Sequence, residues 1–338
     1  MADNMPELGG RSGSIGGTSW GALLGLSRWK TEHDVWVRAM RMPEEEGEPT
    51  PAMLNGIRLE PVVSALAVDA LKMDLREPEI RTERWPEPYV NFTSSIDRLA
   101  FDSGGRLIGP VELKTMSARG NWGERGPANY QLQLQSYLHL CHLKELAAGN
   151  PAGCNWGALV CLQAPAEALT LIRTPEDARF ALENDCARLH VEHFSRDPAF
   201  EEDAIPYAMR WWARHVEGRE MPPVDGSHSC TLAIRSRYAD RDGDMEATAE
   251  IEDIAHEREL VREKIAALKD HKSGLDNRLR DAMGAAHRAQ SSRVRIQIAN
   301  VRGRRRFDAR RFALEHPDLY SEYMIRGGGY DRISVDVF

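Results

Sequence analysis

One strand-like segment constrains the fold of this chain most strongly, because apolar and charged residues alternate along it: Val111, Glu112, Leu113 and Lys114. Successive side chains of a β-strand point to opposite faces, so Glu112 and Lys114 project together, away from the two apolar residues. The apolar face predicts packing against a core, where unpaired charge is costly. The charged face is therefore a candidate site, and the alternative is a solvated surface ion pair.

A second carboxylate, Asp97, is expected beside this pair. Residues 89–100 and 107–115 are predicted strands, and the Ser103-Gly104-Gly105 segment between them is typical of a turn. Pairing of the strands would place Asp97 next to Glu112. Two adjacent carboxylates repel unless a divalent cation lies between them, and hard oxygen ligands suit Mg²⁺ or Mn²⁺. Such a cation could hold a phosphate and activate water, while the neighbouring lysine orients that water or stabilises negative charge.

Two predicted helices flank the hairpin and supply further polar side chains. Residues 52–71 carry Glu60, and residues 129–146 carry Gln133 and Tyr137, which are four apart and share a helical face. The glutamine and tyrosine could hydrogen-bond the lysine, a metal water or a DNA phosphate. The alternatives are an ordinary solvated carboxylate and an amphipathic helix flank.

The rest of the first part of the chain also mixes strands and helices. Residues 155–163 form a short apolar run that predicts a buried strand, and residues 175–195 and 205–217 are predicted helices. The expected fold is therefore α/β, with a mixed central sheet flanked by helices. The prolines and glycine in residues 222–227 are typical of a linker.

The residues after the linker differ from the first part of the chain in composition. Residues 246–290 are highly charged with apolar residues at three-four spacing, which predicts either a helical hairpin or one long coiled segment, with Gly274 as a possible interruption. Beyond it we expect a strand around residues 294–298, a helix opened by Phe307-Asp308 and a short strand over 333–337. The predicted division has three parts: 1–228, 229–290 and 291–338.

Composition limits the function classes. The net charge is -8, yet one basic cluster could grip phosphates, and the alternative for it is a solvated turn and helix face. Its members are Arg302, Arg304, Arg305, Arg306, Arg310 and Arg311. No run of about 18 apolar residues and no secretory start is present, so we expect an intracellular chain with no membrane partner. No P-loop or HExxH pattern occurs, so neither ATP use nor zinc hydrolysis is indicated.

The five cysteines include no CxxC pair, which disfavours a zinc ribbon or a cysteine-bound cluster. Each is interpreted as a small buried hydrophobe.

The order of the candidate residues carries a family resemblance. Glu60, Asp97, Glu112-x-Lys114 and Gln133-x-x-x-Tyr137 together resemble the PD-(D/E)XK nuclease superfamily, and more narrowly the YqaJ-type viral recombinase exonucleases, relatives of lambda exonuclease.

Other segments extend the resemblance over most of residues 11–228. Residues 14–19, 23–27 and 29–31 are similar to the opening motif of that family, and residues 221–227 resemble the end of its nuclease domain. The pattern of residues 294–337 is similar to tails of some phage members.

The resemblance implies roles for individual residues. Asp97, Glu112 and the backbone carbonyl of Leu113 would be metal ligands, and Lys114 would serve the nucleophilic water. Glu60 would bind the metal region directly or through water.

Two further pairs follow from the same resemblance. Gln133 and Tyr137 would support the site, and Arg11 and Thr18 would hold the 5′-phosphate of a DNA end. The chain departs from the family pattern at Asp97-Arg98, where Asp-Gly is common, and at Thr18-Ser19, where an acidic residue often follows. Neither departure removes a metal ligand, and both leave end recognition open.

The function implied is digestion of linear double-stranded DNA from the 5′ end, leaving a 3′ single strand. The resemblance also implies Mg²⁺ or Mn²⁺, a ring-like homo-oligomer, a phage single-strand annealing protein as partner and a bacterial host cytoplasm. Rival hypotheses are an endonuclease or repair nuclease on the same fold, and a DNA-binding protein without catalysis.

Overall fold

The computed structural model describes residues 13–41, 50–238, 243–303, 307–324 and 333–336. The chain divides into two compact units, Met1–Ala239 and Asp240–Phe338. The three-part division at residues 228 and 290 stays a prediction.

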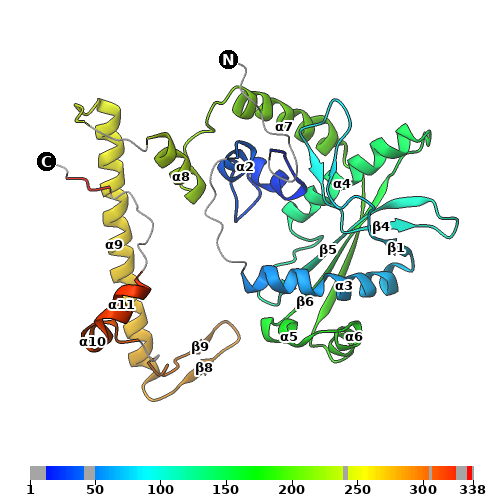
Figure 1. Ribbon diagram of the computed structural model, residues 1–338. Helices are drawn as coiled ribbons and strands as arrows, with labels where there is room; N and C mark the ends of the chain where they lie inside the picture. The colour runs from blue at the N-terminus through cyan, green and yellow to red at the C-terminus, as the bar shows by residue number, and fades with distance from the viewer. Residues whose placement is uncertain (1–12, 42–49, 239–242, 304–306, 325–332, 337–338) are drawn as a thin grey trace. The chain divides into compact units, whose positions relative to one another are not determined.

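A five-stranded mixed sheet forms the centre of the first unit, in the order β1-β4-β5-β6-β7 (Figure 1). The bounds are Asp74–Arg76 for β1, Arg98–Phe101 for β4, Leu107–Ser117 for β5, Trp156–Ala164 for β6 and Arg188–Ser195 for β7. Strands β5 and β6 are parallel and the other neighbours are antiparallel. A parallel pair needs a crossover, and helix α4 (Ala128–Ala147) provides it.

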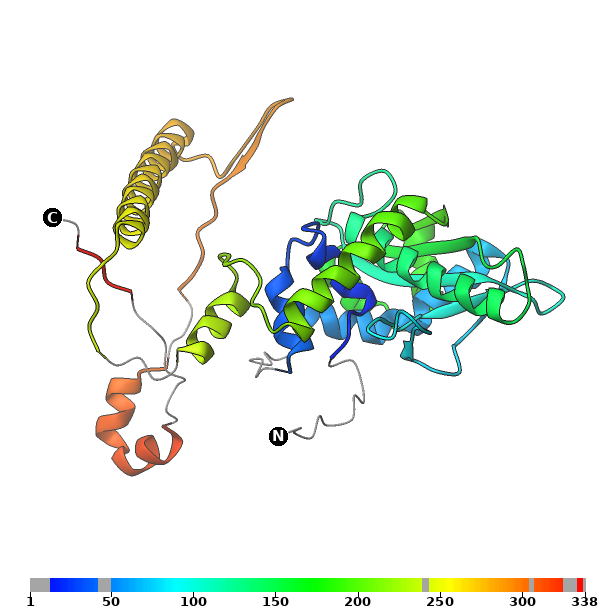
Figure 2. The same cartoon turned by 90° about the horizontal axis from the view of Figure 1, so that it is seen from above.

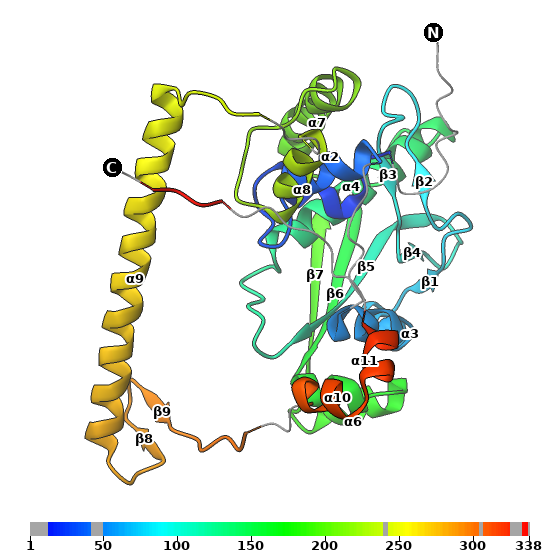
Figure 3. The same ribbon diagram turned by 60° about the vertical axis from the view of Figure 1, so that its left-hand side comes forward.

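Helices cover both faces of this sheet, which confirms the predicted α/β class. Helix α3 (Pro51–Leu71) packs apolar residues such as Leu59 and Leu66 against Val111 and Leu113 of β5. Helix α4 packs against the opposite face, with Leu134 and Leu138 beside Leu159 and Cys161 of β6. Strands β5, β6 and β7 lie side by side in Figure 3. Strand β5 therefore presents its apolar residues to α3 and its charged residues to the α4 side.

Shorter helices complete the first unit, and most of them were not predicted. They are α1 (Trp20–Leu23), α2 (Glu32–Ala39), α5 (Ala166–Leu171), α6 (Pro175–Glu183), α7 (Ile205–Trp212) and α8 (His228–Arg237). The helical stretch around α7 includes the flanking turns Phe200–Ala204 and Ala213–Glu217, in agreement with the helix predicted over 205–217.

Two predicted elements were wrong in extent. The strand over 89–100 is interrupted, because Thr93–Ser94 (β3) pairs with Glu83–Arg84 (β2), whereas β4 begins only at Arg98 and pairs with β1 and β5. The helix over 175–195 ends at Glu183, and residues 188–195 form β7, which pairs with the buried β6. In both cases a distant strand decides the conformation, which local periodicity cannot show.

One interpretation of the cysteines was also wrong. Cys186 is exposed, whereas Cys141, Cys154, Cys161 and Cys230 are buried as expected.

The second unit contains one continuous helix, α9 (Ala249–Met283), and a small β8–β9 hairpin follows it (Figure 2). Gly274 lies within α9 without interrupting it, so the helical-hairpin alternative was wrong. The hairpin strands are Arg288–Gln290 and Arg295–Gln297, and two short helices follow, α10 (Ala309–Glu315) and α11 (Pro317–Tyr323).

Of the helix and the strand predicted near the C-terminus, the helix is confirmed and the strand is not. The side chain of Asp308 accepts a hydrogen bond from the backbone N–H of Arg311, so it caps the helix predicted there. Residues 333–336 have no strand partner, so the strand predicted at 333–337 was wrong for these four, and Val337 lies outside the described residues. Throughout the described part of the chain, no helix has both the length and the apolar character to cross a lipid bilayer.

Candidate active site

The structure brings Asp97 to β5 at the point where the β4–β5 ladder ends. The last pair of that ladder is Arg98 with Val111, and Asp97 precedes it. Its Oδ2 accepts a hydrogen bond of 2.9 Å from the backbone N–H of Leu113. The N–H and C=O of one strand residue point toward the same neighbour, so the carbonyl of Leu113 faces this side too.

Glu112 is the most buried member of the cluster, with a side chain only 1% exposed. Its Oε1 accepts hydrogen bonds from Nζ of Lys114 and, at 2.7 Å, from Nε2 of Gln133. Its Oε2 is buried and receives no hydrogen bond from the described residues. Buried oxygens without a partner are rare and call for an explanation. A cation would satisfy this one, so the residues present fit a divalent metal.

The charges in the cluster are perturbed in a way that also fits a cation. Burial raises the pKa of Glu112 to about 8, with Asp97 adding to the effect and Lys114 opposing it. Burial likewise raises the pKa of Asp97, against the opposing charge of Lys114. Without a metal, the two carboxyl groups therefore share a proton near neutral pH.

Lys114 stays charged in this environment. Burial alone would lower the pKa of its ammonium, but Glu112 and Asp97 outweigh that effect and raise the pKa. The ammonium also lies 5.0 Å from the centre of the Tyr130 ring, a contact that the sequence did not reveal. A fixed positive charge is thus held beside the carboxylate pair.

Gln133 and Tyr137 come together from one face of α4, as their spacing predicted. Nε2 of Gln133 donates to the Tyr137 hydroxyl at 2.9 Å as well as to Glu112. Both side chains are buried. The pair fixes the orientation of the Glu112 carboxylate, and its contribution to catalysis remains a prediction.

Glu60 lies nearby but is paired with Arg98, for which the sequence predicted no role in the site. Nη1 of Arg98 donates to Glu60 Oε1 at 3.0 Å, and Nε of Arg98 donates to Ser64 Oγ at 2.9 Å. The charge of Glu60 is close enough to raise the pKa of Asp97, although burial and Lys114 have larger effects on that group. The Arg98 side chain is only 8% exposed, so the departure from Asp-Gly adds a buried guanidinium beside the site.

The opening motif, residues 14–19, packs against Phe92 and Thr93 and against Tyr137 of α4. Ile15 forms a β-bridge with Phe92, and Ser14 Oγ lies 2.9 Å from Thr93 Oγ1. Gly17 is buried against the Tyr137 ring, whereas the neighbouring Thr18 is exposed. A phosphate pocket built by Thr18 and Arg11 stays a prediction, because Arg11 lies outside the described residues.

We expect Gly17→Ala to impair both folding and DNA cleavage. A Cβ at this position would lie 2.7 Å from the Tyr137 ring and hydroxyl, so the tyrosine and the Gln133 hydrogen bond must shift. Overpacking of this kind costs about 1–3 kcal/mol, and displacing a supporting group lowers cleavage by about tenfold to a hundredfold. Thermal unfolding and initial cleavage rates measure the two effects.

Gly16→Ala is the matched control, because its Cβ would meet only Thr93 Oγ1, at 3.7 Å. Equal stability and equal rates for the two variants would contradict the packing argument.

The DNA-binding arginines predicted in the second unit are only partly described. Arg302 is exposed, and Arg304, Arg305 and Arg306 lie outside the described residues.

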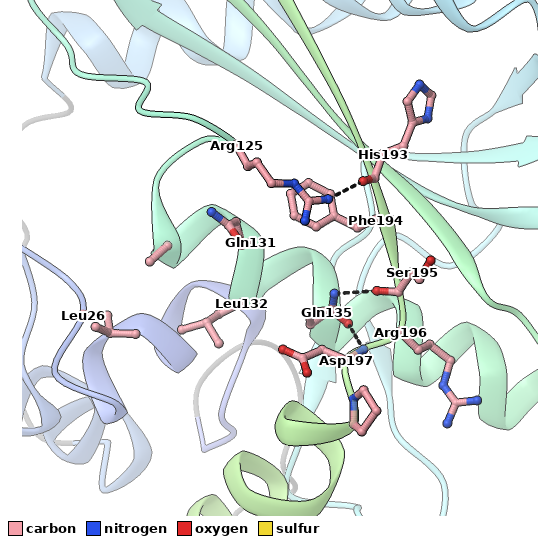
Figure 4. A pocket seen from close by; sticks show the side chains of 12 residues that line it. Leu26, Arg125, Gln131, Leu132, Gln135, His193, Phe194, Ser195, Arg196 and Asp197 are labelled. Carbon is pink, nitrogen blue, oxygen red and sulfur yellow. Dashed lines mark hydrogen bonds between the residues drawn. The ribbon is translucent and has the colours of Figure 1, made fainter.

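A pocket on another side of α4 is lined by a different set of residues from the candidate site. Leu26, Arg125, Gln131, Gln135 and residues 193–198 are among those that line it (Figure 4). Arg125 donates to the backbone carbonyl of His193 at 2.6 Å, and Gln135 donates to that of Ser195 at 2.8 Å. None of the predicted catalytic residues lines this pocket.

The sheet, its two flanking helices and the carboxylate–lysine cluster at the end of the β4–β5 ladder thus form one mixed α/β unit around the candidate site. Residues 8–144 match the family model of the YqaJ-like viral recombinase domain.

Individual relatives were also found. Over 320 residues the chain is 23% identical to the uncharacterized protein YqaJ of Bacillus subtilis (strain 168), covering 92% of this chain and 88% of that protein. It is similar to an alkaline exonuclease (LHK-Exo) from Laribacter hongkongensis, at 14% identity and a TM-score of 0.35, covering 68% and 95% of the two chains. A phage related exonuclease from Haemophilus somnus 129PT gives 13% identity and a TM-score of 0.37, covering 61% and 96%.

Proposed function

We propose that this chain is a metal-dependent deoxyribonuclease, and specifically an exonuclease. It would degrade linear double-stranded DNA from 5′ to 3′ and leave 3′ single strands for phage-type recombination by strand annealing. The observation that carries the proposal is the buried Glu112 oxygen without a hydrogen-bond donor, beside Asp97 and Lys114. The match of residues 8–144 to a viral recombinase domain supports the recombination role.

Each residue of the cluster has a distinct part in this proposal. The carboxylates of Asp97 and Glu112 and the Leu113 carbonyl would hold Mg²⁺ or Mn²⁺, with Glu60 at the edge of the metal region. When bound, the cation supplies Lewis-acid activation of the scissile phosphate and of water. Lys114 orients the attacking water and stabilises the negative charge that develops on the phosphate.

The supporting residues keep this geometry fixed. Gln133 and Tyr137 hold the Glu112 carboxylate in one orientation through a chain of hydrogen bonds. Thr18 is exposed beside the buried Gly17 and, with Arg11, would receive the 5′-phosphate of the DNA end. The 5′ polarity, the annealing-protein partner, the homo-oligomer and the host cytoplasm rest on the family resemblance.

Digestion of a linear duplex labelled separately at its 5′ and 3′ ends tests the function. We expect early loss of the 5′ label with Mg²⁺ or Mn²⁺, no loss in EDTA, and an intact covalently closed circle. Early loss of the 3′ label would reverse the polarity, and cleavage of the circle would favour an endonuclease. DNA binding without cleavage in any divalent metal would favour the DNA-binding protein.

Replacing four arginines of the basic cluster by serine is expected to weaken DNA binding at all sequences equally. The variant changes Arg302, Arg304, Arg305 and Arg306. Each lost phosphate contact lowers the slope of log affinity against log salt by about 0.9. Fluorescence anisotropy in EDTA, at several salt concentrations, measures this slope without cleavage.

Arg179→Ser provides the control, because Arg179 lies on α6, outside the cluster, and already pairs with Asp69 at 2.7 Å. An unchanged salt slope in the four-residue variant would exclude this cluster from the DNA interface.

A further inference from the structure

A second set of metal-ligating side chains lies where α2 contacts α8 in the first unit. It consists of a histidine, a carboxylate and a thiol: His33 on α2, Asp225 in the loop before α8, and Cys230 on α8. One ligand atom from each lies within 4.8 Å of the others. The set belongs to different elements from the carboxylate–lysine site, whose residues lie before β4, on β5 and on α4.

The histidine is prepared to donate a lone pair. His33 is 0% exposed, and its Nε2 lies 2.7 Å from the carbonyl oxygen of Pro223. A carbonyl can only accept, so Nε2 carries the proton and Nδ1 is left with a lone pair. Among the described residues, this buried Nδ1 has no hydrogen-bond partner. A metal-ligating histidine has this arrangement, with its second nitrogen donating to a backbone carbonyl.

The chemistry of the other two ligands identifies the class of metal. A thiol, an imidazole and a carboxylate are a ligand set that suits Zn²⁺, whereas Mg²⁺ prefers oxygen alone. A nucleophilic role for the sulfur is not supported, because Cys230 is 0% exposed and a substrate could not reach it.

The three ligand atoms need to move only slightly closer together to bind one ion. Ligand atoms at about 2.0–2.3 Å from a tetrahedral zinc lie about 3.5 Å apart, so the set must tighten by about 1 Å. Asp225 can supply this movement because it belongs to neither a helix nor a strand. Its Oδ1 accepts a hydrogen bond from the backbone N–H of Ser227 at 2.8 Å, and the side chains of Ser227 and Thr31 also hydrogen-bond this carboxylate, so a bound cation would replace one of these contacts.

We propose that His33 Nδ1, Cys230 Sγ and the Asp225 carboxylate bind a zinc-class cation, with water in the fourth position, that ties α8 to α2. Such a site is structural, since His33 and Cys230 are both buried from solvent. It would fix the final helix of the first unit, close to where the chain enters the second. The inference does not depend on the nuclease function.

Titration of the full-length, chelator-stripped chain with Co²⁺ tests this site. We expect a thiolate-to-cobalt charge-transfer band together with the visible bands of tetrahedral cobalt, saturating at about one ion per chain and displaced by Zn²⁺. Cys230→Ser should abolish the charge-transfer band, and Cys186→Ser, at the exposed cysteine, should leave it unchanged. The carboxylate–lysine site has no thiolate and cannot produce this band.

Circular dichroism will show whether Cys230→Ser folds. If it does not fold, Asp225→Asn tests the metal site instead. The asparagine variant should retain the thiolate band but bind cobalt about tenfold more weakly or worse. The proposal is overturned if the wild-type chain gives no thiolate band, if Cys230→Ser keeps a band of equal strength, or if Asp225→Asn binds as tightly as wild type.

Discussion

Lys114→Ala is expected to lower the rate of metal-dependent DNA cleavage by about 10²- to 10⁴-fold. The ammonium is held by Glu112 and the Tyr130 ring, and it stays charged because the two carboxylates raise its pKa despite burial. It is therefore placed to act on water and phosphate at the metal that we propose Asp97 and Glu112 bind. Initial rates on an end-labelled duplex, at saturating Mn²⁺, measure the loss.

Saturating metal matters because removal of Lys114 also removes the charge that opposes protonation of Glu112. Metal affinity should fall in the variant, and a separate binding titration distinguishes that effect from the effect on the rate.

Lys144→Ala is the matched control, since Lys144 forms an exposed ion pair with Glu83, and such pairs contribute little. Wild-type cleavage by Lys114→Ala would remove the lysine from the mechanism. Failure of the variant to bind metal at any concentration would make its role structural.

The local part of the fold was predictable from the sequence because local patterns determine it. The alternation at residues 111–114 gave strand β5, and helical spacing gave α3 and α4. Strand β5 and helix α4 place Lys114 and Gln133 within hydrogen-bonding distance of Glu112.

The non-local part was not predictable. Strand β7 was interpreted as helix because its residues take their conformation from pairing with β6. The predicted strand over 89–100 was interrupted because its two ends pair with different strands. Pairing energy between distant segments is not encoded in the periodicity of either one.

The same distinction applies within the candidate site. Asp97 lies beside β5 as expected, although it precedes β4 and does not belong to that strand, because a turn of a few residues joins β4 to β5. Arg98 and Tyr130 were missed, because nothing in their spacing marks a guanidinium directed at α3 or a ring beneath Lys114. Cys230 was interpreted only as a buried hydrophobe, because His33 lies on a helix far earlier in the sequence.

In EDTA, the free energy of unfolding is expected to fall as the pH rises from about 4.5 to about 8. Burial, with Asp97 adding and Lys114 opposing, raises the pKa of Glu112 from 4.5 to about 8 in the folded chain. Over that interval the folded state holds a proton that the unfolded state has released, so rising pH favours unfolding. The contribution is fully present below pH 4.5 and lost through pH 8, and is worth roughly 3–5 kcal/mol at most.

A divalent metal should reverse this dependence, because it takes the place of the shared proton between Asp97 and Glu112. We expect Mn²⁺ to stabilise the chain little near pH 5.5 and strongly near pH 8, with release of a proton on binding. Urea unfolding at both pH values, with EDTA or with Mn²⁺, measures the linkage. Glu112→Gln should flatten the pH dependence and abolish the metal effect, whereas Glu183→Gln, at an exposed residue of α6, should change neither. If Glu112→Gln kept both effects of wild type, the cation would bind elsewhere and the proposed catalytic centre would be wrong.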